Sequence, residues 1–307
     1  MKKQLFLMLA MLIPMGNMAQ AQTLMAVKTE SELVTIKVCD ATMTINPEKG
    51  ARIMSLKYKD QEVISQSRFP ESFGSTFWTS PQKEWNWPPV YEFDKGTYQV
   101  ENATPHSDQG SEKHDDRVVM TSEVSPKLKY RIRKEFAADQ KNNAIVVTYS
   151  IINESDETRQ VAPWEITRVA NNGGSIFFDA SLDGITPAGI LTFKSEHGAV
   201  WYQSDEAGEN RKINADGKGW YAYYNNGLLL VKAFDDLTPS QPAPGEAEIQ
   251  VYVNRGKTFI ELEAQGAYTT LKPHEALSWT VRWYLVPVKT DASSKELVKR
   301  VKKILHL

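Results

Sequence analysis

Carboxylates next to aromatic residues are the strongest chemical feature of this sequence. Glu261 and Glu263 alternate within residues 258–263, and this alternation predicts a strand that carries both carboxylates on one face. Two carboxylates that are close together and dry raise each other's pKa, which suits proton transfer. In solvent the same pair is only a polar sheet face, and the sequence leaves both interpretations open.

A third carboxylate, Glu165, follows Trp164 and lies three residues before Arg168. In a strand, Trp164 and Arg168 share one face, and Glu165 points to the other. The carboxylate and the guanidinium could bond to each other or clamp the hydroxyl groups of a substrate. A structural ion pair at a sheet edge is supported equally well by the spacing.

Three of the eight tryptophans, Trp78, Trp85 and Trp87, fall within ten residues that also hold Gln82. Two consecutive prolines close this segment, residues 73–89, and prevent regular strand pairing, so we expect the aromatic residues on a loop. Flat aromatic faces beside amide and carboxylate groups suit a sugar, which presents C–H patches and hydroxyl edges. The alternative is that the tryptophans plug one end of the fold.

Composition and motif content exclude several classes of function. The 307 residues carry a net charge of −2, so the chain offers no basic surface for nucleic acid. A single cysteine allows no internal disulfide, and the histidines show neither HExxH nor a paired spacing. We therefore predict no metal, no cofactor and no nucleic-acid partner. The scattered histidines are His106, His114, His197, His274 and His306.

The elements that must position these residues are mostly strands, because apolar residues recur with period two. Roughly fifteen strands without a βαβ rhythm favour one large antiparallel sandwich over residues 22–307. Residues 68–95 and 204–218 read as long loops and are the candidate rims of a site. The one clear helix begins at Ser293, where Glu296 completes a capping box.

The first residues have the pattern of a cleaved export signal. Two lysines precede an apolar run over residues 5–15, and Ala19-Gln20-Ala21 offers a cleavage site. The run is shorter than the ~20 residues that a membrane-spanning helix needs. We therefore expect a signal peptide over residues 1–21, no membrane insertion after its removal, and a periplasmic or secreted bacterial protein.

Several segments resemble a known superfamily. Residues 50–56, which read Gly-Ala-Arg and then alternating apolar residues, and residues 61–64 resemble the opening of the aldose 1-epimerase (galactose mutarotase-like) superfamily. Residues 153–164 resemble its central segment. The chain is still more similar to the bacterial domain-of-unknown-function 4380 family. Residues 78–82, 85–89, 163–165 and 277–284 carry that similarity.

The resemblance implies an all-β, β-supersandwich fold that holds a sugar in a cleft on one sheet. Epimerases of the superfamily use a histidine as general acid after the central strand and a late-strand glutamate as base. Here Trp164 and Glu165 occupy the place of the histidine, and Glu263, in preference to Glu261, matches the glutamate. We therefore predict Glu263 and Glu165 as the catalytic residues.

The predicted function is a secreted protein that binds or processes a mono- or oligosaccharide. Its chemistry would be proton transfer, as in epimerisation, lyase chemistry or acid-assisted glycoside cleavage. The alternative is a non-catalytic interaction or scaffold sandwich in the cell envelope. A cleft lined by Trp85, Glu165 and Glu263 favours sugar, and a filled surface favours a scaffold. The predicted substrate-binding residues are Arg52, Trp78, Gln82, Trp85, Trp87, Trp164, Arg168 and Glu261.

Overall fold

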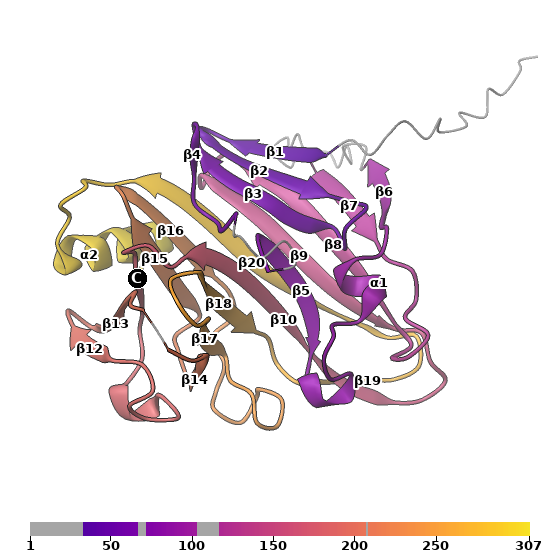
Figure 1. Cartoon of the computed structure of the whole chain (residues 1–307). Helices are drawn as coiled ribbons and strands as arrows, with labels where there is room; N and C mark the ends of the chain where they lie inside the picture. The colour runs from indigo at the N-terminus through magenta and orange to yellow at the C-terminus, as the bar shows by residue number, and fades with distance from the viewer. Residues whose placement is uncertain (1–32, 67–71, 103–116, 207) are drawn as a thin grey trace, which may run out of the picture. The chain divides into compact units, whose positions relative to one another are not determined.

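Two antiparallel sheets of ten strands each form the described part of the chain (Figure 1). The computed structural model describes residues 33–66, 72–102, 117–206 and 208–307. The predicted signal peptide, residues 1–21, lies outside them. Period-two patterning thus predicted the all-β fold correctly, although it found only roughly fifteen of the strands.

The first sheet carries most of the residues singled out in the sequence. Its two short side strands are β4 (Gln61–Glu62), which pairs with β3, and β19 (Thr269–Leu271), which pairs with β10. In spatial order the others are β1 (Val34–Val38), β2 (Ala41–Asn46), β3 (Arg52–Tyr58), β5 (Ser75–Ser80), β10 (Arg159–Ala170), β18 (Phe259–Gln265), β17 (Ile249–Val253) and β14 (Arg211–Ala215).

The second sheet forms the other layer. All of its pairings are antiparallel. In spatial order its strands are β12 (Phe193–Glu196), β13 (Ala199–Gln203), β11 (Ser175–Phe178), β15 (Trp220–Asn225), β16 (Leu228–Ala233), β20 (Ala276–Pro287), β9 (Ala144–Asn153), β8 (Tyr130–Asp139), β7 (Arg117–Thr121) and β6 (Gln99–Asn102).

The core lies between the two sheets. Along β8 every second residue is buried, as expected for a strand with one face against a core. Phe77 of the first sheet stacks on Tyr149 of the second, with ring centroids 4.3 Å apart. Each buried aromatic side chain of this kind contributes about 1.5–3 kcal/mol of transfer free energy, so such contacts hold the layers face to face.

A helix covers the far side of the second sheet. α2 (Ser294–Leu305) begins at the predicted capping box, in which Ser293 and Glu296 bond reciprocally. Its buried residues Leu297, Val298 and Val301 pack against side chains on the outer face of that sheet. None of the helices in the described residues is long and apolar enough to cross a membrane.

Two predicted loops contain strands. Residues 75–80, expected on a loop, form β5, which is buried along its whole length between β3 and β10. Ser, Thr, Phe and Trp all suit a strand, and the two prolines lie beyond its end. Likewise β14 lies within the expected loop 204–218. Three short helical turns complete the described elements: α1 (Tyr91–Asp94), η1 (Gln82–Glu84) and η2 (Leu182–Gly184).

Candidate functional site

A cleft of about 680 Å³ opens on the face of the first sheet that points away from the second sheet. Glu165 in β10 bonds to Lys232 of the second sheet, so the neighbouring side chain of Trp164 points to the opposite, cleft side. The volume lies within the roughly 300–1,000 Å³ of small-molecule sites. The cleft is lined by Ser72, Trp78, Gln82, Trp87, Trp164, Arg168, Asn210, Lys212, Tyr252, Asn254, Arg255, Phe259, Glu261 and Glu263.

Strand register explains why distant residues meet on the cleft floor. Directly opposed residues in antiparallel strands share a face. One such row runs from Lys212 through Tyr252 and Glu261 to Arg168, across β14, β17, β18 and β10. Glu263 lies two residues along β18 and therefore on the same face. The sheet thus places two carboxylates and two cations side by side.

Glu263 is the most enclosed carboxylate of the cleft, with 1% of its surface exposed. Its Oε2 accepts hydrogen bonds from Trp164 Nε1 at 2.8 Å and from Lys212 Nζ at 2.9 Å. Burial raises the pKa of the Glu263 carboxyl above its usual value, although the Lys212 ammonium opposes this shift. A carboxylate with a raised pKa in a cleft is suited to accept a proton from a bound molecule.

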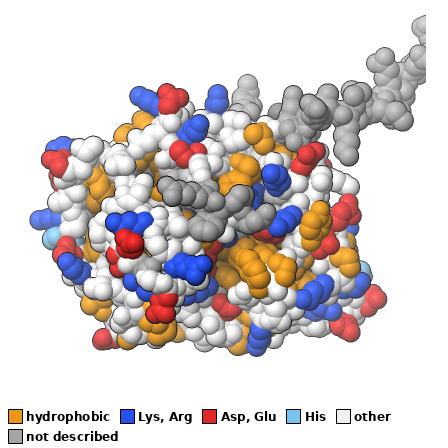
Figure 2. All heavy atoms as spheres, viewed as in Figure 1, with side chains coloured by type: hydrophobic (Ala, Val, Ile, Leu, Met, Phe, Trp, Pro, Cys, Tyr) orange, Lys and Arg blue, Asp and Glu red, His pale blue; other side chains and the backbone are white. Residues whose placement is uncertain are grey.

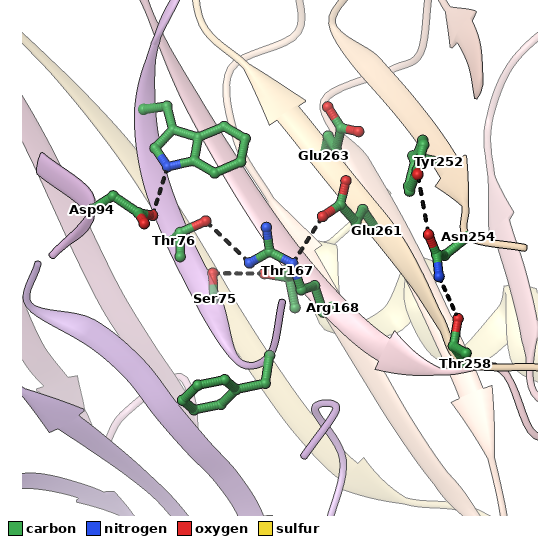
Figure 3. A network of polar contacts seen from close by, with 12 residues as sticks. Ser75, Thr76, Asp94, Thr167, Arg168, Tyr252, Asn254, Thr258, Glu261 and Glu263 are labelled. Atoms are coloured by element: carbon green, nitrogen blue, oxygen red, sulfur yellow. Dashed lines mark hydrogen bonds and ion pairs between the residues drawn. The ribbon is translucent and has the colours of Figure 1, made fainter. Parts of the chain in front are cut away.

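Arg168 is fixed beside Glu261, the second carboxylate of the cleft (Figure 3). Its Nε donates to Glu261 Oε1 at 2.8 Å and its Nη1 donates to Thr76 Oγ1 at 3.2 Å. The guanidinium carbon lies 5.7 Å from the ring centroid of Trp78. Within the described residues Nη2 has no recorded partner. A rigid, 2% exposed guanidinium therefore keeps a donor for a ligand in the cleft.

Aromatic residues form one wall of the cleft. Trp87 is 70% exposed at the rim, and its ring meets Trp78 edge to face at 6.2 Å. Trp78 in turn meets Trp164 edge to face at 5.4 Å. Gln82 also lines this end, where its backbone N–H donates to Glu246 Oε1. The wall therefore offers one exposed indole surface supported by two buried ones.

Trp85 lies behind the wall and not in the cleft. It is only 3% exposed, and its Nε1 donates to the backbone oxygen of Thr79 at 2.8 Å. Its ring packs against Trp78 and Trp164, with centroids 5.7 Å and 6.3 Å away. The two interpretations of the tryptophans thus divide between residues: Trp87 faces the cleft and Trp85 fills the fold.

Arg52 also lies outside the cleft. Its Nη2 donates to both carboxylate oxygens of Asp94 at 3.3 Å. Asp94 Oδ1 accepts a hydrogen bond from Trp78 Nε1 at 2.9 Å. Arg52 therefore acts on the site through Asp94, which orients the indole of Trp78.

The structure does not bring Glu165 and Glu263 together. Glu165 is 0% exposed and points between the sheets, where it bonds to Lys232, also 0% exposed, and to Ser75. Thr167 Oγ1 donates to the same carboxylate at 2.8 Å. The predicted alternation along β10 is correct, but it places Glu165 on the core side and Glu263 on the cleft side. The two carboxylates cannot contact one substrate in this arrangement.

Half of the lining was missed by sequence reasoning. Lys212 precedes Ile213, which is buried, so the period-two pattern of β14 could have identified it. Tyr252 donates to Asn254 Oδ1 at 3.2 Å in a polar chain that continues to Thr258. No local signal places this chain at a site. The residues missed are Ser72, Asn210, Lys212, Tyr252, Asn254, Arg255 and Phe259.

The cleft offers hydrogen-bond donors, acceptors and an aromatic surface, but no metal-binding constellation. Among the described residues no group of three or more His, Cys, Asp and Glu side chains could hold a metal ion. The lining residues can supply proton transfer, ionic contact and stacking.

Comparison with known proteins places the fold. No family model and no curated protein matches the chain. A galactose mutarotase-like protein from Lactobacillus casei has 13% sequence identity and a TM-score of 0.56, over 83% of this chain and 100% of that one. A galactose mutarotase-like protein from Clostridium acetobutylicum has 11% sequence identity and a TM-score of 0.55, over 84% of this chain and 96% of that one. Galactose 1-epimerase from Lactobacillus acidophilus has 12% sequence identity and a TM-score of 0.51, over 84% of this chain and 95% of that one.

These similarities confirm the predicted galactose mutarotase-like β-sandwich. Because the identities are 11–13%, they show the fold and leave the function to the residues of the site.

Proposed function

We propose that this protein binds carbohydrate in the cleft, with a sugar ring stacked on Trp87. The observation that carries the proposal is the pairing of an exposed indole with fixed polar groups on the cleft floor. The indole suits the C–H face of a sugar, and Glu261, Glu263 and Arg168 suit its hydroxyls. A shared fold with galactose mutarotase-like proteins is consistent with this role.

We further propose that residues 1–21 are a cleaved export signal and that the chain belongs to the domain-of-unknown-function 4380 family. The support is the basic and apolar pattern of residues 1–21 and the motifs shared with the domain-of-unknown-function 4380 family. The protein would then meet sugars in the periplasm or outside the cell.

Binding is tested by calorimetric titration of mono- and oligosaccharides against the full chain and two variants. Trp87→Ala removes the exposed ring and should weaken binding about tenfold or more, because stacking area is lost. Tyr91→Ala is the matched control, since Tyr91 is 66% exposed but does not line the cleft. Binding of every sugar with unchanged affinity by Trp87→Ala would refute the proposed site.

Proton transfer by Glu263 is the second part of the proposal. Its motivation is the raised pKa of a buried carboxylate whose oxygen is held by Lys212 and Trp164. Glu263 would take a proton from the sugar, as in epimerisation, and a positioned group of this kind supplies about 10²–10⁴-fold. Lys212, whose Nζ lies 2.9 Å from Glu263 Oε2, is the cation placed to return a proton, and none of the described lining residues is a histidine.

The matched pair for this step is Glu263→Gln and Glu261→Gln. Polarimetry of freshly dissolved aldoses measures mutarotation directly. Glu263→Gln should lose most turnover while retaining sugar binding, whereas Glu261→Gln should mainly affect binding because Glu261 pairs with Arg168. If the wild-type protein binds sugars without turnover, the proposed binding function stands and the epimerase step is excluded.

The scaffold alternative makes a different prediction. It requires that no sugar in the panel binds and that Trp87→Ala instead disrupts association with another envelope protein. The open cleft favours the sugar interpretation over a filled surface, although Trp85 and Glu165 do not line it.

A further inference from the structure

The charges of the cleft do not cancel. Three cationic and two anionic side chains are among its lining residues. Arg168 is paired with Glu261, with a shortest nitrogen–oxygen distance of 2.8 Å, and Lys212 is paired with Glu263 at 2.9 Å. Arg255 is the remaining cation. Within the described residues it has no recorded carboxylate partner, so the lining keeps one unneutralised positive charge.

Arg255 is held at the mouth of the cleft by its backbone. It lies in the turn between β17 and β18, where its backbone N–H donates to Asn210 Oδ1 at 3.0 Å. Its carbonyl oxygen accepts from Thr258 Oγ1 at 3.3 Å. The guanidinium is exposed, and its charge acts on the hydroxyl of Tyr252, where it lowers the pKa that burial raises. A fixed backbone, with a guanidinium that has no recorded carboxylate partner among the described residues, is suited to receive a ligand's anionic group.

A second donor points to the same ligand chemistry. The buried guanidinium of Arg168 uses Nε and Nη1 for Glu261 and Thr76 and has no recorded partner for Nη2 within the described residues. Figure 2 shows basic side chains beside an apolar patch on the viewed face. Guanidinium groups bond carboxylate and other oxyanions through parallel N–H donors, which neutral hydroxyls match less well.

We propose that the cleft selects an anionic saccharide, with the charged substituent of the sugar bound by Arg255 and its ring on Trp87. This inference rests on the proposed carbohydrate function and names the substrate class of that site. The two glutamates do not oppose it, because each already has a cation within hydrogen-bond distance.

The test uses ligand pairs that differ in one negative charge and one methyl group. Galacturonate, glucuronate and mannuronate are each titrated calorimetrically against the full chain beside their neutral methyl esters. We expect at least one uronate to bind about tenfold more tightly than its ester, as for one charge-assisted contact. Added salt should reduce this preference, because Arg255 is exposed and its charge is screened. The 6-phosphates of galactose, glucose and mannose form a second arm, which shows whether carboxylate or phosphate is the preferred anion.

The variants assign the preference to one residue. Arg255→Gln should bind acid and ester about equally, so that the tenfold preference for the acid is lost. Lys257→Gln is the matched control, because Lys257 is exposed on the same turn but does not line the cleft.

The outcomes separate the two proposals. Equal binding of acid, ester and phosphate by the wild type would overturn the anionic preference while the carbohydrate function stands. A preference that survives in Arg255→Gln would overturn the role of that residue. Failure of every sugar to bind would remove the proposed function itself.

Discussion

Replacing Lys232 with methionine should destabilise the protein more than any surface substitution, because it leaves Glu165 as an unpaired charge between the sheets. Both side chains are 0% exposed, and the Lys232 ammonium also lies 3.6 Å from the ring centroid of Trp283. Removing one partner of a buried ion pair costs about 3–5 kcal/mol. Two hydrogen-bond donors, Ser75 and Thr167, remain beside Glu165 and limit the loss to this range.

Urea unfolding near neutral pH measures this loss. Burial lowers the pKa of Lys232 to about 8, against the opposing ion pair with Glu165, so the lysine is charged under these conditions. The midpoint should fall with an unchanged slope, and the melting temperature should drop by about 10 °C. The double variant Glu165→Met/Lys232→Met should recover most of the loss, because replacing both charges with apolar groups is often neutral or stabilising.

Two results would refute this reasoning. A Lys232→Met protein whose free energy of unfolding is within about 1 kcal/mol of the wild type would show that loss of Lys232 does not leave a costly unpaired charge at Glu165. A folded Glu165→Gln protein that binds sugar but loses turnover would instead restore the catalytic role predicted from the sequence for Glu165.

Three further predictions concern other buried or capping groups. Burial lowers the pKa of Lys134 to about 7. The unfolded lysine stays protonated up to about pH 10, so the unfolded chain binds the extra proton and wild-type stability should rise with pH between these values. Lys134→Met should lose that rise, as urea titrations at several pH values would show. If the unfolding free energy rises equally with pH in the variant and the wild type, the prediction is contradicted. Arg52→Met should weaken sugar binding and stability together, because Asp94 loses the cation that fixes it beside Trp78; calorimetry and melting of the same sample check both, and unchanged binding would exclude the role of Arg52. Ser293→Ala should cost about 1 kcal/mol by removing the cap of α2; a change of the same size in Ser294→Ala would show that the cap is not specific.

The fold was largely readable from the sequence because strand alternation is a local property. Residues such as those of β8 alternate strictly between core and surface, so their period shows both the element and its buried face. β5 was assigned to a loop because of the two prolines that follow it, and no alternation opposed that assignment, because the strand is buried on both faces.

The candidate site was only partly predictable because it depends on register. The sequence showed that Trp164 and Glu165 point to opposite faces, but it did not show which of them shares a face with Glu263. The pairing of Ile166 with Glu263 decides this, and a shift by one residue would have placed Glu165 in the cleft. Lys212 was hidden for a similar reason, since it reaches Glu263 across two strand pairings.

The position of β14 at the end of the first sheet has a dynamic consequence for the cleft. Glu263 lies on β18, which is paired on both sides, whereas Lys212 lies on β14, where β17 is the only full strand partner in the described sheet and a single bridge joins Asn214 to Thr186. Edge segments open at lower free energy than central strands, so we expect the amide hydrogens of β14 to exchange with solvent before those of β18. On this expectation the carboxylate belongs to the slowly exchanging part of the sheet and its cationic partner to the faster one, so that the ion pair would separate and re-form while the rest of the sandwich stays closed.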